Sequence, residues 1–315
     1  MSERAVIPVI ALLGPTAVGK SGWAFKLACE NNWEILSCDS RQIYRRMDVG
    51  TAKPSKDELQ QVHHWMVDIC EPDEEFNAYR FAREALMIIR KCADRNVPVL
   101  LCGGTGLYFK ALSEGQTPLE ATKPDIRQQL ITAADKHGCE ALYNELSAVD
   151  ADSAGRIHPN DLQRIIRALG YFRQTGMPIS QGFRKFTPPT DLVFYVAKMT
   201  LDRPRLYDRI NRRTEYMFKN GLYEEFLSLR SSGYNSSTPG LMTVGYRELF
   251  AVEQGKIMRD TAIESVQRNS RHYAKRQITW FSRQLDGTEF NAEAHYEKFR
   301  EFAEKAVRQP GSVFE

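Results

Sequence analysis

Residues 14 to 21 read Gly14-Pro15-Thr16-Ala17-Val18-Gly19-Lys20-Ser21, a complete Gly-x4-Gly-Lys-Ser loop. An apolar run of strand length, residues 6 to 13, precedes the loop, and residues 23 to 30 follow it with helical spacing. In this context the glycines let backbone N–H groups turn toward an anion, and the helix start adds partial positive charge. The Lys20 amine can reach outer phosphate oxygens, and the Ser21 hydroxyl can ligate Mg²⁺. The loop therefore predicts a phosphate site that uses Mg²⁺; an ordinary glycine-rich turn is the alternative.

Alternating strand and helix signals around this loop indicate an α/β fold. Strand-like runs occupy residues 6–13, 35–38, 97–102 and 192–197. An amphipathic helical pattern covers residues 78–94, between the second and third runs. Such alternation predicts a mostly parallel sheet flanked by helices, here of the P-loop NTPase type.

The middle of the chain has a different pattern. Residues 113–190 contain helical segments with polar joints and no convincing strand. We expect a helical insertion domain there, between core segments 1–112 and 191–315. After it, the pattern predicts one long helix over residues 203–230, then helices over 241–252, 263–283 and 292–307.

Composition excludes several classes of protein. The chain has 315 residues, of which 42% are hydrophobic and 26% charged, as in soluble globular proteins. No apolar run approaches the roughly 18 residues that span a bilayer. The six cysteines are scattered without a Cys-x-x-Cys pair, which is typical of a reducing compartment. We therefore expect a cytoplasmic protein with no membrane contact.

Charge is concentrated rather than high. The net charge is only +3, but residues 271–283 hold four Lys/Arg, several aromatic residues and no acid. On a helix, Arg268, Arg271 and Lys275 share one face, which suits the phosphates of a nucleic acid. A solvated face with Trp280 packed into the core is an equally good interpretation of this segment alone.

One acid stands where chemistry is expected. Asp39 ends the second strand, whereas the third strand ends in Cys102-Gly103-Gly104-Thr105 with no carboxylate. The carboxyl edge of a parallel sheet is where such folds place their sites. Asp39 could position Mg²⁺ through water or accept a proton from a nucleophile beside the phosphates. By itself, an Asp-Ser pair after a strand is better explained as a helix cap or a turn.

Seven motifs in a fixed order resemble one family. They are Gly14 to Ser21, Asp39-Ser40-Arg41-Gln42-Ile43-Tyr44, Met47-Asp48-Val49-Gly50-Thr51-Ala52-Lys53-Pro54, Gly103-Gly104-Thr105-Gly106-Leu107-Tyr108, Arg156-Ile157-His158-Pro159-Asn160-Asp161, Val244-Gly245-Tyr246-Arg247 and Lys275-Arg276-Gln277-Ile278-Thr279-Trp280. Together they resemble the tRNA dimethylallyltransferase (IPP transferase) family in its bacterial form. The likeness covers roughly residues 8 to 283, with conservative departures such as Ser21 where threonine is frequent.

The resemblance implies transfer of a dimethylallyl group from dimethylallyl diphosphate to the N6 amine of adenosine 37, in tRNAs that read codons beginning with U. Asp39 matches the position of a general base, and Thr105 that of a residue near the target base. Arg209 matches an arginine that contacts the diphosphate. The loop amides, Lys20, Thr16 and Mg²⁺ on Ser21 would hold the leaving group.

The resemblance also implies contacts with the tRNA anticodon stem-loop, and we expect no obligate protein partner and a monomer. The matching positions are Asp39, Ser40, Arg41, Gln42, Thr105, Arg127, Gln163, Arg164, Ile165, Ile166, Arg167, Met242, Thr243, Val244, Gly245, Tyr246, Arg247, Lys275, Arg276, Gln277, Ile278, Thr279, Trp280, Phe281 and Ser282.

Three other functions compete with this one. A P-loop kinase or nucleotide hydrolase would use the loop for ATP, but it usually has a carboxylate on the third strand. A prenyltransferase acting on free adenine nucleotides would have less need of the basic segment at 268–283. A non-catalytic RNA-binding adaptor leaves Lys20, Ser21 and Asp39 unexplained.

Overall fold

The computed structural model describes residues 6–115, 122–182 and 188–311. Contacts divide the chain into two compact units. The core unit comprises Met1–Ser113 with Pro188–Glu315, and the insertion unit comprises Glu114–Thr187. These limits lie close to the predicted ones at 113 and 190, although residues 116–121 and 183–187 fall outside the described residues.

A six-stranded sheet forms the centre of the core unit. Its order is β3-β2-β4-β1-β5-β6, and every neighbouring pair is parallel. The strands are β1 Ile7–Leu13, β2 Glu34–Cys38, β3 His64–Trp65, β4 Val99–Gly103, β5 Leu192–Thr200 and β6 Thr288–Asn291. The predicted parallel α/β fold is confirmed; the two edge strands, β3 and β6, were not predicted.

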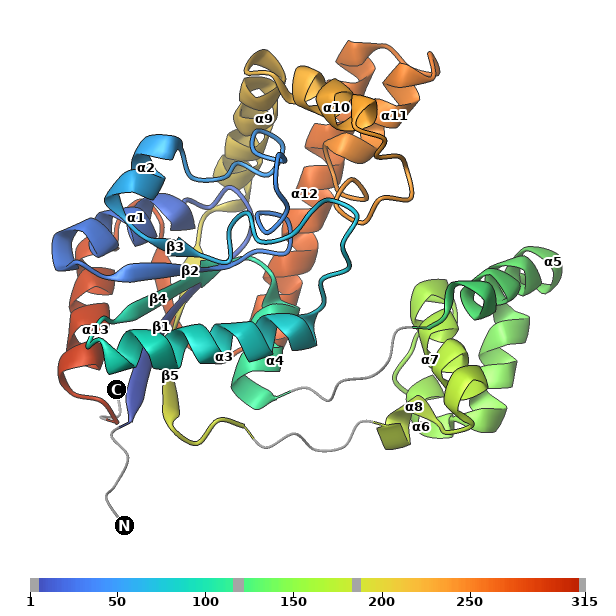
Figure 1. Ribbon diagram of the computed structural model, residues 1–315, viewed down its shortest axis with the longest axis horizontal. Helices are drawn as coiled ribbons and strands as arrows, with labels where there is room; N and C mark the ends of the chain where they lie inside the picture. The colour runs from blue at the N-terminus through green and yellow to red at the C-terminus, as the bar shows by residue number, and fades with distance from the viewer. Residues whose placement is uncertain (1–5, 116–121, 183–187, 312–315) are drawn as a thin grey trace. The chain divides into compact units, whose positions relative to one another are not determined.

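Helices cover both faces of this sheet (Figure 1). Alternate residues of the buried strand β1 face opposite ways, so Ile10 and Leu12 join one core while Val9, Ala11 and Leu13 join another. The first core holds α1 (Lys20–Asn31), part of α9 (Arg203–Lys219) and α13 (Tyr296–Arg308). The second holds α3 (Ala78–Asp94) and α4 (Gly106–Glu114).

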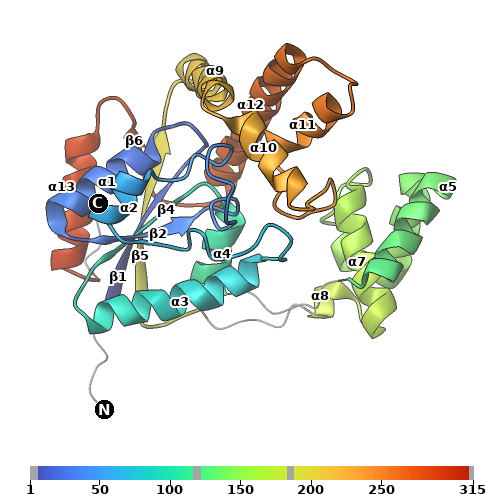
Figure 2. The same cartoon turned by 45° about the horizontal axis from the view of Figure 1, so that its top comes forward.

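Four helices from the second half of the core unit lie together, apart from α13 (Figure 2). The predicted helix over 203–230 is wrong, because it is two helices, α9 and α10 (Leu222–Ser231). Gly221 separates them with φ 99°, a left-handed conformation that glycine adopts without steric cost. The C-terminal end of α9 packs with α10, α11 (Tyr246–Glu253), α12 (Arg259–Gln284) and residues 43–47 in a third core.

Two further helices also begin later than the sequence pattern predicts. The helix expected over 241–252 starts only at Tyr246, since Gly245 precedes it with φ 103°. The helix expected over 292–307 is α13 and starts at Tyr296. The short helix α2 (Lys56–Gln61) lies between β2 and β3.

Helices joined by turns make up the described residues of the insertion unit. It consists of α5 (Pro124–Val149), α6 (Ala151–Ala154), α7 (Leu162–Thr175) and α8 (Ile179–Gly182) around a separate apolar core. Gly138 interrupts α5 with φ 82°. Among the residues that the structure describes, no helix combines the length and the apolar character needed to cross a bilayer.

Candidate active site

A cavity of about 560 Å³ opens at the carboxyl edge of the sheet in the core unit. Its walls come from the phosphate-binding loop, from the segments after β2 and β4, and from α9 and α12. Residues 50–52 and 242–245 complete the lining. This edge is where parallel α/β sheets place their ligands.

The phosphate-binding loop presents backbone amides to this cavity. Gly19 has φ 110° and Ala17 has φ 64°, so the chain turns through two left-handed residues before α1. Helix α1 begins at Lys20, has no side-chain cap and has no acidic residue in its first turn. The first N–H groups of a helix lack intrahelical acceptors, and no acid of α1 neutralises the positive end of its dipole. The loop is therefore suited to an anion.

Lys20 is buried at the base of the cavity, with only 8% of its surface exposed. Its Nζ donates to the Pro15 carbonyl at 2.7 Å. Burial lowers the pKa of Lys20 to about 8, and the negative groups nearby, among them Asp39, oppose that shift. The amine remains largely charged at neutral pH and gains most from an anion placed against it.

Asp39 lies where β2 ends and lines the same cavity. Its Oδ1 accepts the Arg41 N–H at 2.8 Å, which fixes the turn that follows the strand. The loop after β4 fastens this turn, since the Thr105 N–H donates to the Cys38 carbonyl and the Thr105 hydroxyl accepts the Ser40 N–H. Thr105 itself does not line the cavity.

Two arginines one turn apart on α9 have different surroundings. Arg209 donates to the Val18 carbonyl at 2.9 Å and pairs with Glu293 at 3.0 Å, outside the cavity lining. Arg213 lines the cavity and donates to the Thr16 hydroxyl at 3.2 Å. Burial lowers the pKa of Arg213, and the nearby Asp39 carboxylate offsets only part of this shift. The role predicted for Arg209 stays a prediction, and geometry favours Arg213 for it.

Arg213 is not among the residues predicted for the site, although the sequence holds a signal for it. Residues four apart on a helix share a face, so a helix that brings Arg209 to the phosphate-binding loop brings Arg213 to the same side. What the sequence does not show is which arginine the packing of α9 turns inward.

Gln277 bonds to the loop that follows β1 and to the loop that follows β4. Its Oε1 accepts the Thr16 N–H at 2.9 Å, and its Nε2 donates to the Gly104 carbonyl at 2.8 Å. The side chain is 7% exposed, so this residue of the basic segment fastens the phosphate-binding loop to α12. Its predicted contact with tRNA is untested.

The cavity brings together many of the residues predicted to bind tRNA. Those that line it are Asp39, Ser40, Arg41, Gln42, Met242, Thr243, Val244, Gly245, Arg247, Arg276 and Gln277. Lys275, Thr279 and Ser282 are exposed elsewhere on α12. The side of α12 that holds Arg268, Arg271 and Lys275 is therefore not the side that lines the cavity, which holds Val266, Ser270 and Gln277.

The remaining predicted RNA contacts differ in exposure, and Arg167, Ile278 and Trp280 are partly buried. In the insertion unit, Arg127, Gln163 and Arg164 are exposed. In contrast, four of the predicted side chains are buried in apolar cores: Ile165, Ile166, Tyr246 and Phe281. Contact of these four positions with RNA stays a prediction, and their side chains are not available for it in the free chain.

The donor set near the phosphate-binding loop is compatible with Mg²⁺. Ser21 and Asp39 both line the cavity, and hydroxyl and carboxylate oxygens are ligands that Mg²⁺ accepts. Within the described ranges, no group of three His, Cys, Asp or Glu residues could hold a metal by itself. A magnesium ion here would therefore need oxygen ligands from a bound phosphate as well.

Comparisons with known proteins agree with this geometry. A family model described as IPP transferase matches residues 42–284. The chain is 43% identical to tRNA dimethylallyltransferase 1 of Citrifermentans bemidjiense, over 89% of this chain and 90% of that protein. It is 41% identical to the tRNA dimethylallyltransferase of Bacillus pumilus, over 90% and 89% respectively.

The fold is also found among solved structures. The tRNA isopentenylpyrophosphate transferase of Bacillus halodurans superposes with a TM-score of 0.70 at 34% sequence identity. The match covers 96% of this chain and 97% of that one. A match over most of the sequence and most of the structure means that the chain belongs to the IPP transferase family.

Proposed function

We propose that this protein transfers a dimethylallyl group from dimethylallyl diphosphate to N6 of adenosine 37 in tRNA. The observation that supports it best is that one cavity is lined by Asp39, Lys20 and Arg213, with Asp39 close enough to raise the pKa of both cations. A proton acceptor and an electropositive cradle for a leaving group are the two parts that such a transfer needs. The names of the relatives point the same way.

The cradle would hold the diphosphate. Lys20, Arg213 and the amides that open α1 supply positive charge where negative charge grows as the C–O bond breaks. The apolar part of the lining, from Ile210, Met217 and Val266, suits a five-carbon tail. Mg²⁺ held by Ser21 would add charge neutralisation at the phosphate oxygens when bound.

Asp39 would collect the proton. The N6 amine of adenine is conjugated to the purine ring and is a weak nucleophile, so it needs a base as the N–C bond forms. The adenosine would have to leave the anticodon loop to reach this depth, as bases do in other enzymes that modify them. Arg41 and Gln42, on the turn after Asp39, also line the cavity.

A kinase function is less consistent with the structure. Strand β4 ends at Gly103 and places Cys102 in the cavity lining, where P-loop kinases usually carry a carboxylate for magnesium. Burial raises the pKa of Cys102 to about 11, so it remains a neutral thiol there.

The direct test is incubation with unmodified tRNA, radiolabelled dimethylallyl diphosphate and Mg²⁺. We expect the label to appear on adenosine 37 and to be absent from a tRNA with guanosine at that position. Rapid splitting of ATP with no label on RNA would falsify the proposal.

A substitution then tests the base. Asp39→Asn keeps an oxygen for the Arg41 N–H but cannot take a proton, so we expect kcat to fall roughly 10³-fold with tRNA affinity unchanged. The matched control is Asp57→Asn, an exposed acid in the first turn of α2 that does not line the cavity. Near-normal turnover of Asp39→Asn would remove Asp39 from this role.

A further inference from the structure

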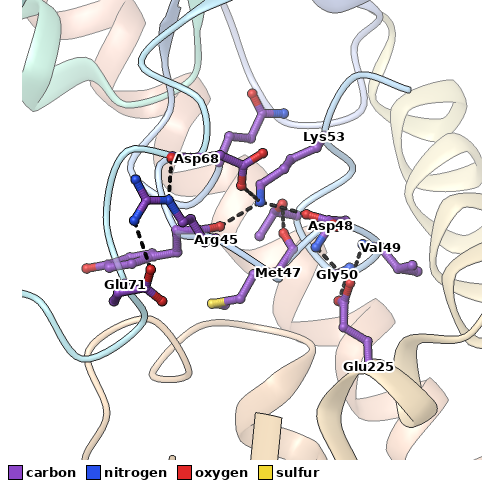
Figure 3. Close-up of polar contacts among 12 residues, drawn as sticks. Arg45, Met47, Asp48, Val49, Gly50, Lys53, Asp68, Glu71 and Glu225 are labelled. Carbon is purple, nitrogen blue, oxygen red and sulfur yellow. Dashed lines mark hydrogen bonds and ion pairs between the residues drawn. The ribbon is translucent and has the colours of Figure 1, made fainter. Parts of the chain in front are cut away.

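The carboxylate of Glu225, on α10, holds a turn of backbone that lies far from it in the sequence (Figure 3). It accepts the N–H groups of Asp48 at 2.7 Å, Val49 at 2.8 Å and Gly50 at 3.0 Å. The Tyr246 hydroxyl donates to the same carboxylate. Four donors thus converge on one side chain.

The turn that Glu225 holds is part of the cavity wall, although Glu225 is not. Gly50, Thr51 and Ala52 line the cavity. Gly50 also fits closely against the Tyr246 ring, where an added Cβ would lie 2.5 Å from ring atoms. The carboxylate and the ring therefore determine together where residues 50–52 stand.

Two carbonyls of this turn orient polar side chains in the cavity. The Thr51 carbonyl accepts from Arg213 at 3.5 Å, and the Ala52 carbonyl accepts from Gln42 Nε2 at 3.0 Å. Arg213 belongs to the cradle, and Gln42 to the turn that carries Asp39. A shift of the 48–52 backbone would therefore move groups on both sides of the reaction.

Lys53 holds the other side of the same turn (Figure 3). Its Nζ donates to the Tyr44 carbonyl at 2.6 Å and to Asp48 at 2.7 Å, and it also contacts Asp68. Only 3% of the Lys53 side chain is exposed. The turn is held in one position because the Glu225 carboxylate and the Lys53 ammonium both bond to it.

We propose that Glu225 is a positioning residue for prenyl transfer. From outside the cavity it fixes the 48–52 backbone, so that the carbonyls of Thr51 and Ala52 hold Arg213 and Gln42 in place. An ionised carboxylate is required because it accepts hydrogen bonds from all the N–H groups at once, and such bonds are roughly twice as strong as neutral ones. This inference rests on the proposed function for its catalytic consequence.

The test is Glu225→Gln, with Glu224→Gln as the matched control. Both remove one negative charge from the first turn of α10, but the exposed Glu224 does not bond to the turn. We expect Glu225→Gln to raise the KM for dimethylallyl diphosphate and the Kd for magnesium pyrophosphate about tenfold. Values equal to those of Glu224→Gln would overturn the proposal.

A double-mutant cycle separates positioning from a general loss of structure. If Glu225 acts through Arg213, Glu225→Gln should cost much less in an Arg213→Lys background than in the wild type. If the losses caused by Glu225→Gln and Arg213→Lys simply multiply in the double variant, Glu225 does not act through Arg213. If Glu225→Gln does not fold, Glu225→Asp replaces it, because this variant keeps the charge on a shorter side chain. A pyrophosphate Kd above that of the wild type supports the proposal, and a wild-type Kd overturns it.

The pyrophosphate readout also separates this inference from the proposed function. A wild-type protein that labels no RNA would refute the proposed function, and the pyrophosphate affinities of the two variants would still decide the role of Glu225. A wild-type protein that labels RNA, together with a Glu225→Gln variant of normal affinity and KM, would refute only the role of Glu225.

Discussion

The core unit has two clusters of backbone N–H groups that suit an anion. In one, the anion is a carboxylate of the protein itself; in the other, the residues that the structure describes supply none. At residues 48–50 the amides close on the Glu225 carboxylate. At the start of α1 the cap residue is Gly19, with no side-chain cap and no acid in the first turn. The first cluster is completed by folding, and the second depends on a ligand.

The charges around the two clusters differ in the same way. Lys53, beside the first, has carboxylate partners in Asp48 and Asp68. Lys20, beside the second, donates to a backbone carbonyl, and burial depresses its pKa to about 8. Since burying a charge is costly unless it is paired, the second cluster gives up stability to keep a binding site ready.

The largest effect that tests this comparison is that of Lys20→Met. Loss of a preorganised cation at the leaving group should lower kcat/KM about 10³-fold. Below about pH 8 the folded chain carries a desolvated ammonium, a cost that fades as the pH rises toward 10.5, the usual pKa of lysine. We therefore expect the free energy of unfolding at pH 7, measured with denaturant, to rise by at most about 3 kcal/mol.

The corresponding variant in the first cluster, at residues 48–50, is Glu225→Ala. It leaves three amides without their acceptor, so we expect a loss of roughly 1–3 kcal/mol in the same unfolding experiment. If Lys20→Met destabilised the protein as much as Glu225→Ala does, the contrast between a ligand site and a structural site would be lost.

A smaller effect ranks the two arginines of α9. Arg213→Lys keeps the charge but cannot bridge the Thr16 hydroxyl and the Thr51 carbonyl, so we expect kcat/KM to fall about 10²-fold. Arg209→Lys changes a partly exposed ion pair with Glu293 and should alter kcat/KM less than about threefold. Steady-state kinetics with varied dimethylallyl diphosphate measure both, and the reverse order would restore the diphosphate contact to Arg209.

The smallest effect depends on pH. Because the pKa of Lys20 is about 8, its ammonium is lost as the pH rises through that value. The Kd for magnesium pyrophosphate should increase roughly tenfold between about pH 7.5 and pH 9.5. Calorimetric titration of Lys20→Met provides the control, since any rise that remains in this variant comes from the ligand and not from the lysine.

The sequence predicts the interior of the sheet well because local signals decide it. The predicted runs 6–13, 35–38, 97–102 and 192–197 become β1, β2, β4 and β5, and α3 occupies the predicted residues 78–94. Strand β3 has only two residues, and β6 pairs along one side alone. Their positions follow from tertiary pairing, which no local pattern reports.

The site is only partly predictable for a related reason. The phosphate-binding loop and Asp39 are marked by motifs, and the cavity brings them together. Helix α9 has five arginines, and only packing shows that Arg213 faces inward. The bond from Glu225 to residues 48–50 joins positions more than 170 apart in the chain. An exposed-looking acid on an amphipathic helix gives no sign of such a partner.

The placement of β1 between β4 and β5 has a consequence for synthesis on the ribosome. Strand β1 is made before the insertion unit, yet its partner β5 begins only at Leu192, after the whole of that unit. The nascent chain therefore carries an unfinished sheet while the insertion unit, which has its own core, can already fold. Once folded, that unit shortens the effective loop that β1 and β5 must close, which lowers the entropic cost of completing the sheet.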